Sequence, residues 1–124
     1  MSLREGAAEL LTECRNRGLK IGICSDLTAH IQHCKLKALG ISAYIDCLVT
    51  SEEVGVEKPD QRVFQLILKK LACAPDDVLY IGDSLERDVY GAEACGISVL
   101  WFLGKNRDNA VANFGEVRKW LQWT

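Results

Sequence analysis

The stretch from Leu79 to Asp88, with the sequence LYIGDSLERD, decides the fold of this chain. Its apolar beginning is typical of a buried strand, and that strand runs directly into a Gly-Asp pair. A second aspartate follows five residues after the first, near the start of an expected helix. Hard divalent cations prefer oxygen ligands, and Mg²⁺ usually takes one or two carboxylates together with substrate phosphate. The stretch therefore predicts a strand end that presents Asp83 and Asp88 to a metal ion.

Apolar strands alternate with amphipathic helices along the rest of the chain. Strands are expected at Lys20–Cys24, Cys47–Thr50, Val78–Ile81 and Val99–Phe102. Helices are expected at Leu3–Cys14, at Ala29–Leu39, behind the N-cap Asp60 as far as Leu71, at Arg87–Cys95 and at Asn113–Gln122. This order predicts parallel strands joined by right-handed crossovers, in a sheet covered on both faces. The fold class is α/β, a doubly wound parallel sheet, and residues 1–124 form one domain.

The composition excludes several classes of function. A net charge of −2 offers no basic surplus for a phosphate backbone, so no nucleic-acid partner is expected. No apolar run approaches the length of a membrane span, so we expect no membrane partner and a cytoplasmic location. Six cysteines occur, none at C-x-x-C spacing, and buried, reduced thiols are favoured over a disulfide or a zinc site. They are Cys14, Cys24, Cys34, Cys47, Cys73 and Cys95.

The expected strands end in polar residues where a ligand would bind. In open α/β sheets the ligand lies beyond the carboxyl ends of the strands. Those ends are Ser25-Asp26, Ser51-Glu52 and Gly82-Asp83, and Lys58 lies on a loop between two of the expected elements. Each piece has an ordinary explanation by itself, because such residues also cap helices, form turns or decorate solvated loops. Only their combination indicates a site.

In this order, Ser25, Lys58-Pro59, Gly82-Asp83 and Asp88 resemble the later motifs of the haloacid dehalogenase-like hydrolases, in the small-molecule phosphatase branch. The resemblance implies that the serine and adjacent amides hold a phosphoryl group, while the lysine offsets negative charge. It also implies a small phosphorylated molecule as substrate and Mg²⁺ as cofactor. On this basis the candidates are Lys58 for catalysis, Ser25, Asp26 and Lys58 for phosphate binding, and Asp83 and Asp88 for the metal.

The family's first motif, an Asp-x-Asp whose leading aspartate attacks phosphorus, does not occur in these 124 residues. Without that nucleophile no aspartyl-phosphate forms, so the chain is expected to be a truncated, inactive carboxyl-terminal core with weak Mg²⁺ binding. The first strand and the cap are expected to be absent as well. Asp26 is the one candidate for a substitute nucleophile, although a helix-capping role suits it better.

In the family the first strand lies between those that correspond here to Lys20–Cys24 and Val78–Ile81. Its removal would leave these two strands about 9 to 10 Å apart, twice the normal spacing. Bare strand edges invite association. The two strands are therefore expected either to pair directly or to be bridged by a strand from a second chain, through a dimer or a complementing polypeptide.

Two other functions fit parts of the pattern. A non-catalytic pseudoenzyme module would keep the loops and bind phosphate or a partner without turnover. A phosphoacceptor receiver domain matches the length and also uses acidic residues, a Ser or Thr and a Lys-Pro. There, however, the acidic residues come first and the Lys-Pro comes last, whereas here Ser25 comes first and Asp83 follows Lys58. The order of the motifs excludes the receiver domain.

Overall fold

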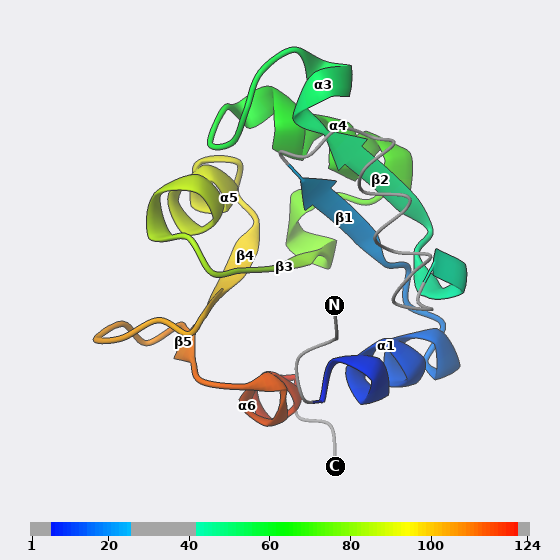
Figure 1. Cartoon of the computed structure of the whole chain (residues 1–124), viewed down its shortest axis with the longest axis vertical. Helices are drawn as coiled ribbons and strands as arrows, with labels where there is room; N and C mark the ends of the chain where they lie inside the picture. The colour runs from blue at the N-terminus through cyan, green and yellow to red at the C-terminus, as the bar shows by residue number, and fades with distance from the viewer. Residues whose placement is uncertain (1–5, 26–41, 122–124) are drawn as a thin grey trace.

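The computed structural model describes residues 6–25 and 42–121, and Figure 1 shows how their elements are arranged. The α-helices are α1 (Ala7–Asn16), α3 (Ser51–Val54), α4 (Gln61–Leu71), α5 (Gly91–Ala94) and α6 (Phe114–Trp120). The strands are β1 (Gly22–Ser25), β2 (Cys47–Thr50), β3 (Leu79–Gly82), β4 (Ser98–Phe102) and β5 (Ala110–Val111). Two 3₁₀ turns, η1 (Ser42–Tyr44) and η2 (Pro75–Asp77), and a π-helical segment, η3 (Leu85–Tyr90), complete the described elements.

The strands are parallel, as predicted, but they form two separate sheets. β1 pairs with β2, and β3 pairs with β4, which pairs in turn with β5. Of the two predicted arrangements, direct pairing of Lys20–Cys24 with Val78–Ile81 is not found, because in residues 6–25 and 42–121 no ladder joins β1 to β3. Bridging by a strand from a second chain stays a prediction.

Burial along the strands reflects this division. Every residue of β1 and β3, the strands that flank the break, is only half-buried. By contrast, β2 buries Val49 and Thr50, and β4 buries Val99, Leu100 and Phe102. In a doubly wound sheet the central strands are normally the most covered. The two strands that flank the break are therefore less covered than their partners β2 and β4.

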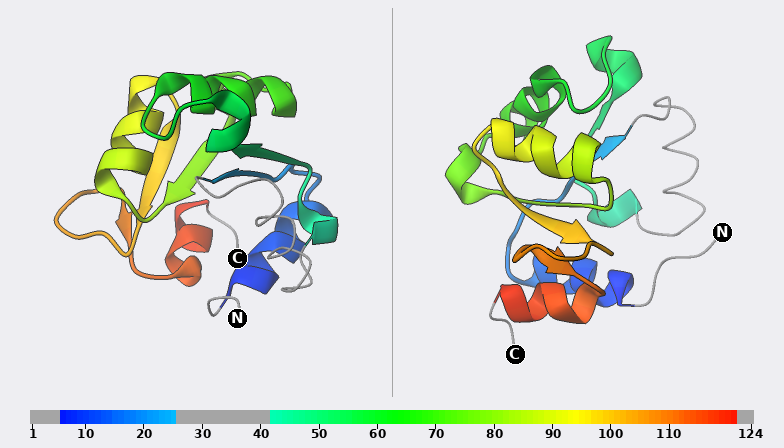
Figure 2. Two further views of the ribbon diagram at one scale, coloured as in Figure 1. Left: turned by 45° about the horizontal axis from the view of Figure 1, so that its top comes forward. Right: turned by 90° about the vertical axis from the view of Figure 1, so that its left-hand side faces the viewer.

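Helices lie on both sides of the strands, which confirms the α/β architecture: α4 and α5 on one side, α1 and α6 on the other (Figure 2). Each side has its own apolar core. Under α4 and α5 the buried residues are Val49, Val63, Phe64, Ile67, Leu71, Val89, Ala92, Ile97 and Val99. On the side of α1 and α6 they are Leu10, Leu100, Phe102, Val111 and Val117.

The capping signal in the sequence placed the start of α4 correctly. The Asp60 carboxylate accepts a hydrogen bond from the backbone N–H of Arg62 at 2.9 Å, so the predicted N-cap of α4 is confirmed. The helix expected at Arg87–Cys95 instead begins two residues earlier with the π-helical η3 and ends in the short α5. The sequence pattern did not indicate α3 or β5, which span only four and two residues. The helix predicted at Ala29–Leu39 lies outside the described residues.

The cysteines within the described residues are free thiols, as predicted, but they are not fully buried. Each of them is half-buried, because it lies at the margin of a core where neighbouring elements cover only part of the side chain. These are Cys14, Cys24, Cys47, Cys73 and Cys95. Cys34 lies outside the described residues. No helix within residues 6–25 and 42–121 is both long and apolar enough to span a bilayer.

Candidate active site

A shielded ion pair joins two of the predicted site residues. Lys58 lies in the loop between α3 and α4, and Asp88 lies in η3, thirty positions later. The Lys58 ammonium donates to Oδ1 of Asp88 at 2.7 Å. The two side chains are only 12% and 6% exposed, so their charges interact in a poorly solvated environment. The structure therefore brings the predicted catalytic lysine and one predicted metal ligand into direct contact.

Both carboxylate oxygens of Asp88 accept further hydrogen bonds. The Tyr80 hydroxyl donates to Oδ1 at 3.2 Å, and the backbone N–H of Ser84 donates to Oδ2 at 3.2 Å. Gly82 provides the space for this carboxylate, because a Cβ at Gly82 would overlap with the Asp88 side chain. Close packing thus requires a glycine at this position. Three donors, from Lys58, Tyr80 and Ser84, hold the Asp88 carboxylate.

Tyr80 extends this network towards β1. Its ring packs edge-on against Phe64 of α4, with centroids 5.2 Å apart. Its hydroxyl also interacts with the thiol of Cys24, which lies on β1. Burial raises the pKa of Cys24 to about 12 and raises the pKa of Tyr80 well above its usual value. Both groups therefore keep their protons at neutral pH, and the hydroxyl of Tyr80 is available as a donor to Asp88.

Asp83 occupies a different environment from Asp88. It is exposed at the end of β3, and its backbone carbonyl accepts a hydrogen bond from Nε1 of Trp101 at 3.2 Å. Within residues 6–25 and 42–121 no group of three His, Cys, Asp or Glu side chains is placed to hold a metal ion. Asp88 is engaged with Lys58, Tyr80 and Ser84, which leaves Asp83 as the remaining predicted ligand. The described residues do not by themselves fit Mg²⁺.

Of the other predicted phosphate-binding residues, Ser25 lies in the described part of the chain, next to the break between the sheets. Ser25 is the last residue of β1 and is half-buried. Asp26 lies outside the described residues. Sequence reasoning missed Tyr80 and Cys24, which join Lys58 and Asp88 in one polar cluster. The signal for Tyr80 was a hydroxyl-bearing side chain within an otherwise apolar strand, two positions before Gly82.

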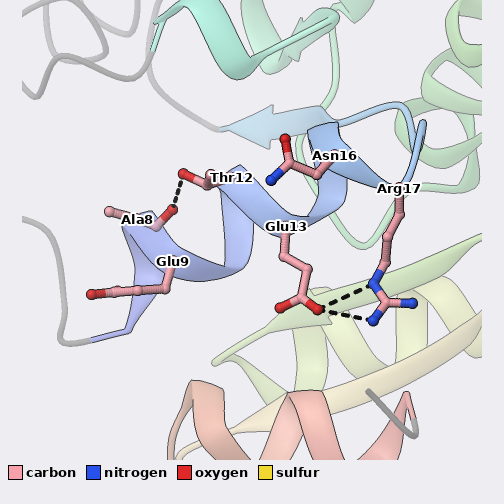
Figure 3. Close-up of a pocket in the computed structure, with 6 residues that line it drawn as sticks. All are labelled: Ala8, Glu9, Thr12, Glu13, Asn16 and Arg17. Carbon is pink, nitrogen blue, oxygen red and sulfur yellow. Dashed lines mark hydrogen bonds and ion pairs between the residues drawn. The ribbon is translucent and has the colours of Figure 1, made fainter. Parts of the chain in front are cut away.

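A shallow hollow elsewhere on the surface contains none of these residues (Figure 3). It lies along α1, and its most prominent contact is an ion pair in which Arg17 donates to Glu13 at 2.9 Å. Its lining consists of Ala8, Glu9, Thr12, Glu13, Asn16 and Arg17. The strand-end loops, rather than this hollow, carry the candidate chemistry.

Comparison with known proteins identifies the family. Residues 1–102 match the family of haloacid dehalogenase-like hydrolases. Ribulose-1,5-bisphosphate 5-phosphatase from Halopiger xanaduensis is 41% identical over 102 residues, which cover 82% of this chain and 43% of that protein. Phosphoserine phosphatase from Thermus thermophilus is 33% identical over 95 residues, covering 77% of this chain and 38% of that protein. The chain thus spans less than half the length of these two relatives.

The solved structures agree with the sequence relatives. A phosphatase of the same family from Thermococcus onnurineus superimposes with a TM-score of 0.86 and 30% identity, over 96% of this chain and 58% of that one. The family match covers most of the chain, and the motifs predicted from the sequence lie in the family's order. We conclude that this chain belongs to the haloacid dehalogenase-like hydrolases.

Proposed function

We propose that this chain is the carboxyl-terminal core part of a Mg²⁺-dependent, cytoplasmic phosphatase that acts on small phosphorylated molecules. The observation that carries the proposal is the shielded Lys58–Asp88 ion pair at the edge where the strands end. Relatives named as phosphatases, such as those from Halopiger xanaduensis and Thermus thermophilus, support the same class of reaction.

Each candidate residue has a distinct role in this proposal. Lys58 balances the negative charge of the phosphoryl group, and Ser25 and Asp26, with adjacent backbone amides, contact its oxygens. Asp83 contributes one carboxylate to the metal site, and Asp88 supports the site by orienting Lys58. Mg²⁺, when bound, would neutralise charge on the phosphate. Because the described residues do not by themselves fit Mg²⁺, the remaining ligands have to come from outside them.

The chain by itself lacks the attacking group. No Asp-x-Asp occurs in its sequence, and positioning or charge neutralisation cannot transfer a phosphoryl group without a nucleophile in line. We therefore expect these 124 residues alone to be inactive. A segment that carries the Asp-x-Asp is expected to bind as a strand between β1 and β3. The half-buried residues along both strands and the missing ladder between them support this placement.

An assay with an aryl phosphate and Mg²⁺ tests the proposal. The chain is assayed alone and after mixing with a peptide that contains the first strand of a relative, including its Asp-x-Asp. The matched control is the same peptide with both aspartates replaced by asparagine. Turnover with the first peptide only supports a complemented phosphatase. Turnover by the chain alone that is lost in Asp26→Asn would instead identify Asp26 as a substitute nucleophile.

A second candidate function is a non-catalytic module that binds phosphate or a partner. The missing Asp-x-Asp and the fact that Lys58 is already paired with Asp88 favour it. Titration with inorganic phosphate, followed by backbone amide chemical shifts, distinguishes the two candidates. Shifts around Ser25 and Lys58 without turnover in any peptide mixture would support the binding module. Unchanged shifts at tens of millimolar phosphate would exclude an anion site in the isolated chain.

A further inference from the structure

The polar cluster around Asp88 connects side chains from β1, β3, η3 and the loop before α4. No backbone ladder joins β1 to β3 in the described residues. The Tyr80 hydroxyl on β3 interacts with the Cys24 thiol on β1 and donates to Oδ1 of Asp88 in η3. The same oxygen accepts from the Lys58 ammonium, which comes from the loop before α4. Oδ1 of Asp88 therefore accepts from two donors, the Tyr80 hydroxyl at 3.2 Å and the Lys58 ammonium at 2.7 Å.

The ring of Tyr80 is held firmly enough to direct its hydroxyl. It packs edge-on against Phe64, which is fully buried in α4. Gly82, two residues later on the same strand, allows Asp88 to come close to β3. Because alternate residues of a strand face the same side, Tyr80 and Gly82 together face Asp88. The strand thus presents both the space for the carboxylate and the donor that orients it.

We propose that Tyr80 is a positioning residue that orients the Asp88 carboxylate and, through it, holds the Lys58 ammonium at the strand-end site. The inference rests on the proposed function for the importance of Lys58, but the contacts themselves do not depend on it. Without the Tyr80 hydroxyl, the Asp88 side chain loses its only described side-chain donor other than Lys58. The carboxylate then rotates more freely, and Lys58 loses a fixed partner.

The ε-ammonium of Lys58 provides a direct readout. An ammonium in a rigid, poorly solvated ion pair exchanges its protons slowly with water, so it gives a separate ¹H–¹⁵N signal at low temperature. In Tyr80→Phe, which retains the ring and loses only the hydroxyl, we expect a shifted Lys58 signal and exchange faster by about tenfold. The matched control is Tyr90→Phe, because Tyr90 is exposed and lies two residues from Asp88. We expect this control to retain the wild-type signal.

Two results would overturn the role of Tyr80. A Lys58 ammonium signal with the same shift and exchange rate in Tyr80→Phe as in the wild type overturns it. A wild-type protein without a resolved Lys58 ammonium signal also overturns it, because the ion pair is then not held rigidly. Neither measurement needs metal, substrate or turnover. Failure of the phosphatase assay and failure of this inference are therefore distinguishable.

A second measurement applies if Tyr80→Phe does not fold. In a Tyr44→Phe, Tyr90→Phe background, 3-fluorotyrosine enters only at Tyr80, since the chain contains three tyrosines. The fluorine makes the phenol a stronger donor and leaves the ring packing nearly unchanged. We expect the Lys58 ammonium signal to shift between the fluorinated and unfluorinated proteins in this background. An identical signal in both would contradict a link from Tyr80 through Asp88 to Lys58.

Discussion

The Lys58 ammonium lies 2.7 Å from Oδ1 of Asp88, and both side chains are almost fully shielded from solvent. This contact changes how the two residues are interpreted, because the sequence assigned the lysine to phosphate and the aspartate to a metal ion. In the structure each neutralises the other. An anion that approaches Lys58 therefore has to share the ammonium with Asp88, which lowers the affinity expected for free phosphate.

Removal of Lys58 is expected to destabilise the fold strongly. In Lys58→Met the Asp88 carboxylate, which is 4% exposed, stays buried without its cationic partner. Such changes cost about 3 to 5 kcal/mol in free energy of unfolding. The double variant Lys58→Met, Asp88→Asn should be more stable than Lys58→Met alone, because no unpaired charge is then buried. Urea unfolding of the single and double variants measures this coupling.

The exposed pair between Lys70 and Glu53 is the matched control for that experiment. Its side chains are 29% and 42% exposed, so solvent screens the interaction. Lys70→Met should therefore lower the free energy of unfolding by about 1 kcal/mol or less. If Lys58→Met costs no more than Lys70→Met, then the Lys58–Asp88 pair does not contribute to stability as the geometry indicates.

Substitution of Gly82 should displace the Asp88 carboxylate. In Gly82→Ala the added methyl group overlaps with Cβ, Cγ and Oδ2 of Asp88, so η3 must move away from β3. Overpacking of this kind costs about 1 to 3 kcal/mol. Thermal unfolding measures the loss, and amide shifts at Ser84 report whether its hydrogen bond to Asp88 has changed. Wild-type stability together with an unchanged Ser84 shift would show that the site is looser than described.

Cys24 should make stability depend on pH in the alkaline range. Burial raises the pKa of its thiol from 9.0 to about 12. Below pH 9 the thiol keeps its proton in both the folded and the unfolded chain, so its contribution to stability is fully present. Between pH 9 and about 12 the unfolded chain loses the proton first, so the free energy of unfolding falls as pH rises.

Comparison of the wild type with Cys24→Ala isolates this effect from the other groups that titrate at high pH. The variant should show a shallower decline in the free energy of unfolding above pH 9. Cys73→Ala serves as the control for the packing lost when a half-buried thiol is removed. Parallel curves for the wild type and Cys24→Ala across this range would contradict the raised pKa.

Glu13 should contribute modestly to the contact between α1 and α6. Its carboxylate pairs with Arg17 on its own helix and with Arg118 on α6. The arginines are 43% and 32% exposed, so Glu13→Gln should cost about 1 kcal/mol or less, and added salt should reduce the difference. Glu9→Gln, an exposed change on the same helix, is the control. A larger, salt-independent loss for Glu13→Gln would indicate a packing role instead.

The sequence by itself determined the elements whose signals are local. The apolar stripe of α4 and its Asp60 cap, the strand at Cys47–Thr50 and the strand leading to Gly82-Asp83 all follow from periodicity and capping within a few residues. The family could also be recognised from the sequence, because the order of Ser25, Lys58-Pro59 and Gly82-Asp83 along the chain does not depend on the fold. Such features can be recognised without knowledge of any contact between distant residues.

Only the tertiary structure decided which side chains meet and which strands pair. Lys58 and Asp88 are thirty residues apart, and Tyr80 joins them through an apolar strand, so no local pattern showed their contact. The sequence also did not reveal that β1 and β3 lie in separate sheets, or that the described thiols are only half-buried. Burial and strand pairing depend on what distant elements cover a given residue. The periodicity of a strand reveals which residues face the same side, but not how closely its neighbours approach.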